Sequence, residues 1–319
     1  MTSLHSRQPA LLDGTFPLPI DRPFTMRQAR DAGVSRHRVR TLEAESLVRR
    51  VIKGVYVANQ VPDSIALRTQ ALLLVVPRDA VLTDWTACWF FTGLLPPNQH
   101  LAVPELHVFR PAGHDRLRND LCASGERSFA HGDLMAAGAL TMTTPLRAAW
   151  DLGRLAHRDI AIGALDALLR HGTFAPDELV AGIERFKGMR GVVQLRQLAP
   201  LADARSESPG ESTLRLRWLD LPSLPPPTPQ VPVTVGSVEV YRIDLAVPEL
   251  RYGCEYDGEA FHGADVRTRD VARRQDLAAR FEWDVDAVRR SNVYGAGRDV
   301  EEVLYRGIDR ARLAWGRCL

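Results

Sequence analysis

Side chains able to do chemistry gather in one short stretch, CEYDGEAFH, at residues 254–262. Glu255 and Asp257 stand two residues apart, so in a strand both carboxylates project from the same face. Gly258 marks a break in the chain, and His262 follows it. Asp244 lies near the end of the preceding strand-like run, where a hairpin would bring its carboxylate beside that of Glu255. The order of these residues predicts a cluster of carboxylates with a histidine beside it.

Such a cluster indicates a divalent metal ion. Carboxylates with pKa values of about 4 all carry charge at neutral pH and repel one another, and a hard cation relieves that repulsion. Oxygen ligands favour Mg²⁺ or Mn²⁺ over zinc. Such an ion activates water and stabilises the charge that builds on a phosphodiester, while His262 would act as general base or protonate the leaving oxygen. A simpler interpretation is an acidic turn in which Glu255 pairs with an arginine.

The elements around the stretch form a β-rich segment. Gly236-Ser237 separates two strand-like runs and is a hairpin signal, and a third run, LRYGCEYDG, carries Glu255. A short helix, ESTLRLRWLD, comes before them, and the proline-rich LPSLPPPTPQ sets an extended path into the first strand. The neighbouring strands are therefore expected to position the carboxylates.

The segment 21–60 differs from the rest of the chain, because its net charge of +5 exceeds the +2 of the whole protein. Thr25 and Ser35 are N-cap residues for two short helices separated by Gly33, and Lys53-Gly54 is a turn between two β-rich runs. Helix, glycine turn, helix and hairpin are the layout of a winged helix-turn-helix, whose second helix enters the major groove. The candidate DNA-binding residues are Arg36, His37, Arg38, Arg40 and Lys53. The alternative is a solvated pair of basic helices.

The segment 61–204 reads as mainly helical, with one pair of short strands expected in HLAVPELHVFRP. Its histidines lack metal-site spacing, and its aromatic residues are typical of a core. We therefore expect no chemistry there.

The order of Asp244, Glu-x-Asp-Gly and a trailing histidine resembles the very-short-patch-repair-like branch of the PD-(D/E)xK nucleases, in particular bacterial domains of unknown function that carry EYDG…H. The resemblance covers about residues 205–315. It implies Asp244 and Glu255 as metal-site residues, Glu211 as the acidic residue that completes the site, and His262 as a catalytic histidine. Asp257 departs from the pattern, because most of the superfamily has a catalytic lysine there. The resemblance also implies a basic helix that follows the phosphate backbone through Arg267, Arg269, Arg273 and Arg274.

The front of the chain resembles the AbiEi-type antitoxin architecture of actinobacterial proteins, in which a helix-turn-helix precedes a helical middle part. That resemblance implies DNA binding, with self-repression and a toxin or abortive-infection partner as further expectations. A palindromic target would imply a homodimer.

Composition excludes several classes. The four cysteines form no CxxC pair, which argues against a zinc site and a disulfide framework and favours a reducing compartment. The start of the sequence lacks the apolar run of a signal peptide, and ALLLVV is too short to span a bilayer. We expect a soluble cytoplasmic protein that makes no membrane contact.

The sequence as a whole predicts a multi-domain α/β protein. The expected parts are a winged helix-turn-helix over 1–60, a mainly helical middle domain over 61–204, and a restriction-endonuclease-like mixed sheet flanked by helices over 205–319. Two functions remain open. One is a Mg²⁺- or Mn²⁺-dependent DNA endonuclease, with an RNA-directed nuclease as its variant. The other is an antitoxin-like transcriptional regulator with a non-catalytic nuclease fold.

Overall fold

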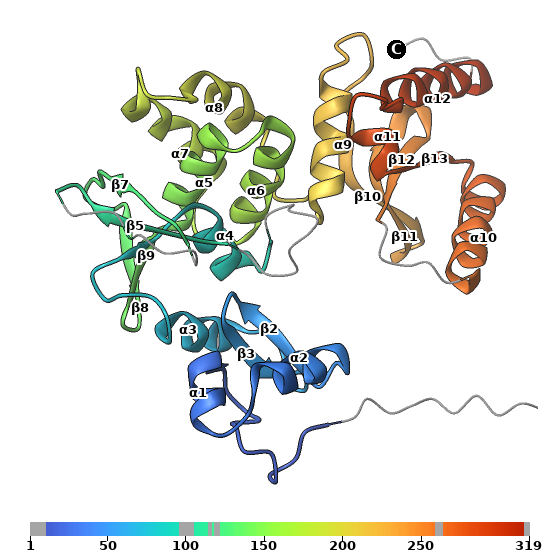
Figure 1. Ribbon diagram of the computed structural model, residues 1–319. Coiled ribbons are helices and arrows are strands. Elements are labelled where there is room, and N and C mark those ends of the chain that lie inside the picture. The colour runs from blue at the N-terminus through green and yellow to red at the C-terminus, as the bar shows by residue number, and fades with distance from the viewer. Residues whose placement is uncertain (1–10, 96–104, 114–116, 118–121, 259–263, 316–319) are drawn as a thin grey trace, which may run out of the picture. The chain divides into compact units, whose positions relative to one another are not determined.

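The computed structural model of the protein describes residues 11–95, 105–113, 117, 122–258 and 264–315 (Figure 1). The chain divides into two compact units, Met1–Leu152 and Gly153–Leu319. The described residues form helices together with three β-sheets. The expected mixed α/β composition is confirmed.

The first unit has two sheets. In chain order its elements are β1 (Phe24–Thr25), α1 (Met26–Asp31), α2 (Arg36–Ala44), β2 (Val48–Ile52), β3 (Val55–Ala58), α3 (Ile65–Leu73), β4 (Val81–Leu82), α4 (Asp84–Thr92), β5 (Leu106–Pro111), β6 (Cys122–Ala123), β7 (Glu126–Arg127), β8 (Leu134–Ala137), β9 (Leu140–Thr143) and the start of α5 (Pro145–Leu155).

The first two helices begin where the sequence predicts. The Thr25 side chain accepts the N–H of Gln28, whose own side chain accepts the Thr25 N–H, and the Ser35 hydroxyl accepts the N–H of Arg38. Between the helices, Gly33 adopts a φ of +79°, a left-handed conformation that glycine reaches without strain. Helix α2 then buries Val39 and Leu42, which lie three residues apart.

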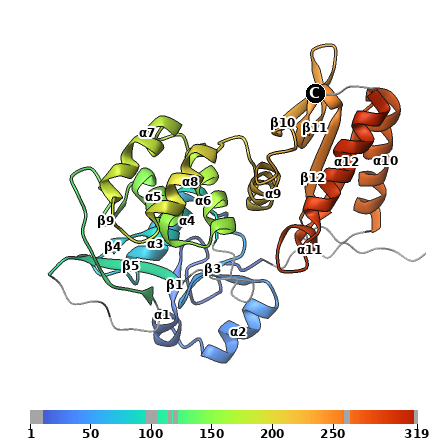
Figure 2. The ribbon, with the colours of Figure 1, turned by 90° about the horizontal axis from the view of Figure 1, so that it is seen from above.

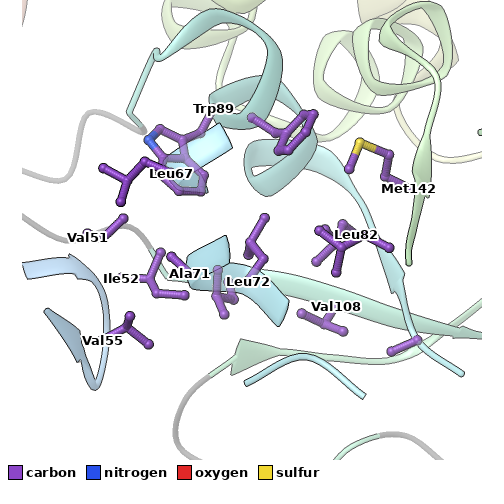
Figure 3. Packing of buried hydrophobic residues seen from close by; sticks show 14 of the residues in the cluster. Val51, Ile52, Val55, Leu67, Ala71, Leu72, Leu82, Trp89, Val108 and Met142 are labelled. Carbon is purple, nitrogen blue, oxygen red and sulfur yellow. The ribbon is translucent and has the colours of Figure 1, made fainter. Parts of the chain in front are cut away.

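The hairpin β2–β3 that follows is tied to the rest of the unit by apolar packing. Its two strands pair antiparallel around the turn at Gly54, and β1 pairs antiparallel with β3 on the side away from β2. Figure 3 shows Val51, Ile52 and Val55 of the hairpin in one cluster with Leu67 and Leu72 of α3. The hairpin is thus part of a shared core.

The middle of the chain contains more sheet than we expected. One strand of the expected pair, β5, belongs to a six-stranded sheet of order β6-β5-β4-β9-β8, with β7 also paired to β5. Strands β4, β6 and β7 have two residues each. Runs of that length are too short to show a period of two, so the sequence pattern did not reveal them.

The second unit combines helices with a four-stranded sheet. After the end of α5 its elements are α6 (Arg158–Arg170), α7 (Pro176–Ala181), η1 (Gly182–Phe186), α8 (Val192–Leu198), η2 (Ala199–Leu201), α9 (Pro209–Leu219), β10 (Thr228–Val235), β11 (Val238–Val247), η3 (Pro248–Leu250), β12 (Tyr252–Asp257), α10 (Ala264–Phe281), β13 (Asp284–Arg289), α11 (Arg290–Val293) and α12 (Val300–Trp315).

The sheet has the order β10-β11-β12-β13, antiparallel except for the parallel pair β12–β13. Figure 2 shows α9, α10 and α12 around it. Helices α9 and α12 share one apolar cluster with β11 and β12, and α10 contributes Leu277 to a second cluster with β10 and β11. The mixed sheet flanked by helices follows the predicted order of elements.

Helix α9 is also held by α6 through two buried ion pairs. Arg215 Nη2 lies 2.7 Å from Asp166 Oδ2, and Arg217 pairs with Asp159. The expected domain boundaries at 60/61 and 204/205 stay predictions, and the division of the chain into two compact units falls between Leu152 and Gly153.

No helix in the described part of the chain is both long enough and apolar enough to cross a membrane.

Candidate functional site

Two of the predicted acidic residues lie on neighbouring strands. The ladder between β11 and β12 includes the pair Leu245–Cys254, so Asp244 and Glu255 come next to that pair on their two strands. There the Asp244 side chain enters the strand interface, because its Oδ2 accepts the backbone N–H of Tyr256 at 2.9 Å. The hairpin geometry expected from the sequence therefore brings these residues to one place.

The third acidic residue, Glu211, comes from the first turn of α9. Ser208 caps this helix by accepting the N–H of Glu211 at 3.2 Å. The helix can approach the sheet closely because residue 210 is glycine: a Cβ there would lie 2.1 Å from Cε1 of Tyr256. Glu211 is 8% exposed, and its Oε2 accepts hydrogen bonds from the Glu207 N–H and the Gln230 amide, both at 2.8 Å.

Glu211 and Glu255 both act electrostatically on Asp244. Burial, followed by the negative charge of Glu211 and then by that of Glu255, raises the pKa of Asp244 from 3.8 to about 7, against the opposing hydrogen bond from Tyr256. Burial also raises the pKa of Glu255, although Arg273 opposes this. Such raised pKa values are typical of carboxylates gathered in a functional site.

Arg273 of α10 supplies a positive charge at this place. Its Nη1 donates to Glu255 Oε2 at 2.8 Å, its Nη2 lies 2.7 Å from Glu255 Oε1, and Nη2 also donates to the carbonyl of Arg242 at 2.6 Å. We expected Arg273 to follow a phosphate backbone, whereas here its guanidinium lies on Glu255. The pairing of Glu255 with an arginine was the simpler of the two interpretations of the sequence.

The carboxylate oxygens of Glu211, Asp244 and Glu255 are ligands that a hard cation prefers, but they do not converge on one point. Glu255 Oε1 is buried and accepts no hydrogen bond of good geometry, and the positive charge beside it is the Arg273 guanidinium at 2.7 Å. Within the described residues, however, no three His, Cys, Asp or Glu side chains stand close enough to hold a metal ion. A divalent ion bound by Glu211, Asp244 and Glu255 would require these side chains to converge and the Arg273 guanidinium to withdraw.

The other residues predicted for this site lie at the end of β12, on α10 or outside the described residues. Asp257 ends β12, and its negative charge contributes to the raised pKa of Glu255. Arg274 is half-buried on α10, and its positive charge acts on Glu255 in the opposite direction. Arg267 and Arg269 belong to α10, with side chains outside the described part, and His262 lies outside the described residues altogether.

The predicted DNA-binding residues lie together on α2 and the hairpin. Arg36, His37, Arg38 and Arg40 are exposed, and the described residues include no acidic partner for them within ion-pair distance. Lys53 is exposed in the turn between β2 and β3. Four cationic or titratable side chains on nine residues of one helix form a positively charged surface.

The structure also contains charged groups that the sequence did not indicate. In the first unit, burial alone would raise the pKa of Asp84, but hydrogen bonds from His107 and Arg127 lower it to about 2. Arg127 Nη1 lies 2.6 Å from Asp84 Oδ1 and 3.0 Å from Asp151 Oδ2, and Arg147 pairs with Asp133 and Asp151. All of these buried carboxylates are paired, so the network is structural in character. The sequence also did not indicate Gln230 or which arginine pairs with Glu255, because neither follows from local spacing.

No family model matches the chain. Two uncharacterized proteins of Mycobacterium tuberculosis, one from strain CDC 1551 and one from strain H37Rv, are each 35% identical to it over 178 residues. The matched part is 54% of this chain and 63% of each relative, so this chain spans less than two thirds of the curated relatives it matches.

Proposed function

We propose that this protein binds DNA and hydrolyses its phosphodiester bonds with the help of Mg²⁺ or Mn²⁺. The observation that carries the proposal is the effect on Asp244 of two further carboxylates from other elements, Glu211 and Glu255, together with the pairing of Arg273 with Glu255. Three buried or half-buried carboxylates are costly unless something positive compensates them. One guanidinium leaves Asp244 with a pKa of about 7.

In this proposal each side chain has a separate role. Glu211, Asp244 and Glu255 hold the ion, which when bound supplies an activated water and stabilises charge on the phosphate. Asp257, in the place of the usual lysine, and His262 move the proton. Arg274 with the other basic residues of α10 binds the DNA backbone.

The proposal includes the finer architecture. Helices α1 and α2 with the hairpin β2–β3 are a winged helix-turn-helix that resembles the AbiEi-type arrangement, and α2 enters the major groove. The sheet β10–β13 with its helices is a PD-(D/E)xK-like domain of the very-short-patch-repair type. The order of elements supports both assignments, and the exposed basic residues of α2 support the first.

A second function is favoured by one specific observation. Arg273 neutralises Glu255 without any metal ion, and residue 257 is an aspartate where a lysine is usual. In that case the second unit is a non-catalytic platform, and the protein is a DNA-binding regulator of the antitoxin type, with a toxin partner and a dimeric state as further expectations.

One experiment separates the two functions. Supercoiled plasmid is incubated with the full-length protein and Mn²⁺, with Asp244→Asn and Glu255→Gln as site variants and Arg38→Ala as the α2 variant. If the protein is a nuclease, we expect wild type to nick the plasmid and the two site variants to leave it intact. Both site variants should still bind DNA in gel shifts. Intact plasmid with wild type, together with metal-independent binding that Arg38→Ala weakens, would replace the nuclease with the regulator.

A further inference from the structure

We propose that Gln230 is a positioning residue for the carboxylate site, holding one oxygen of Glu211 so that the other remains available to a cation. The inference rests on the proposed function of Glu211, Asp244 and Glu255. It adds a residue that no sequence pattern indicated.

The backbone of Gln230 is the first observation. This residue has a φ of +55° within β10, a left-handed conformation that non-glycine residues rarely adopt and that is costly in a strand. Pro229 pairs with Leu245 and Val231 pairs with Ile243, so Gln230 lies between these pairs, opposite Asp244. The strained backbone therefore lies opposite Asp244 in the pairing of β10 with β11.

The side chain of Gln230 is the second observation. Its Nε2 donates to Glu211 Oε2 at 2.8 Å, and the same oxygen accepts the Glu207 N–H at 2.8 Å. A carboxylate oxygen only accepts, so the amide must present its NH₂ group here. The described residues include no hydrogen-bond donor to Oε1 of Glu211.

The chemistry of an amide explains why glutamine suits this place. A lysine or arginine would orient Glu211 equally well but would neutralise it, as Arg273 does for Glu255. A neutral amide fixes the carboxylate and leaves its negative charge for a divalent cation. Such outer-sphere partners commonly change metal affinity by about 10–100-fold.

The test measures Mn²⁺ binding by titration calorimetry on the full-length protein, with thermal unfolding on the same samples. Gln230→Met keeps the length of the side chain and removes the donor, whereas Gln230→Gly removes the side chain and relieves the backbone. The matched control is Gln194→Met, because Gln194 donates to the carbonyls of Gly153 and Ala156 in the same unit.

We expect both Gln230 variants to bind Mn²⁺ at least about tenfold more weakly than wild type. The glycine variant should have the higher Tm of the two, because glycine adopts a positive φ freely. Gln194→Met should lower the Tm and leave the affinity for Mn²⁺ unchanged.

The inference alone is overturned if wild type binds Mn²⁺ and Gln230→Met binds it equally well, or loses no more affinity than Gln194→Met. If wild type does not bind Mn²⁺ at all, the proposed metal site fails and the inference fails with it.

Discussion

Replacing Asp244 with asparagine should stabilise the metal-free protein at neutral and alkaline pH. The carboxylate is ionised in the unfolded chain above its usual pKa of 3.8, but in the folded protein burial, Glu211 and Glu255 raise that pKa to about 7. Between these two values folding takes up a proton. The wild-type free energy of unfolding is therefore highest below about pH 4 and falls as pH rises toward 7. Asparagine has no proton to take up, and its Oδ1 can still accept the Tyr256 N–H.

The size of the effect follows from the two pKa values. A pKa difference of one between the folded and unfolded states changes the free energy of unfolding by about 1.4 kcal/mol. The difference between 3.8 and about 7 therefore corresponds to about 4 kcal/mol. The advantage of Asp244→Asn should begin near pH 4, grow through the intervening range, and level off above about pH 7. Since Asp244 is half-buried, structural relaxation and water will reduce the plateau, and about 2–4 kcal/mol is the expected range.

The assay is urea unfolding of the full-length protein in a chelator at several pH values from 4.5 to 8.5. Asp309→Asn is the control, because Asp309 is exposed on α12 and its replacement should leave the wild-type pH slope intact. Equal pH slopes for wild type and Asp244→Asn would refute the raised pKa of Asp244. Saturating Mn²⁺ should reverse the order, because an ion that binds only the wild-type fold stabilises it.

Two further predictions concern arginines. Arg273→Gln should strengthen Mn²⁺ binding in a calorimetric titration, because it removes the guanidinium that lies on Glu255; an affinity equal to or lower than that of wild type would contradict this competition. Arg127→Met should lower the free energy of unfolding by about 3–5 kcal/mol, because it leaves buried Asp84 and Asp151 without this partner. The control Arg196→Met loses only a surface pair with Glu184 and should cost about 1 kcal/mol or less, so similar losses in urea unfolding would count against the buried network.

The sequence predicted those features that depend on neighbouring residues. Thr25 and Ser35 cap helices through hydrogen bonds to amides three residues ahead, and Gly54 and Gly236 turn hairpins with a positive φ. Each of these is encoded within four or five residues. The order of strands around Asp244 and Glu255 followed from the same local signals.

The remaining features depend on distance in the chain. Arg273 reaches Glu255 across 18 positions and Gln230 reaches Glu211 across 19. No local pattern distinguishes Arg273 from the other arginines of α10, and the strain at Gln230 is a property of the folded backbone. The ion pairs between α6 and α9 also depend on distance in the chain, because Arg215 reaches Asp166 across 49 positions and Arg217 reaches Asp159 across 58. They join residues on the two sides of the expected boundary at 204/205.

The ion pairs between α6 and α9 limit how this protein can be divided or recombined. A fragment that starts at residue 205 keeps all three carboxylates but lacks Asp166 and Asp159. The buried side chains of Arg215 and Arg217 then have no acidic partner from α6. Removing one partner of a buried pair costs about 3–5 kcal/mol, and two such losses approach the whole stability of a typical domain. Gene fusions or grafts that move the sheet to another protein must therefore carry α6 as well. The segment that folds stably is longer than the segment that contains the three carboxylates.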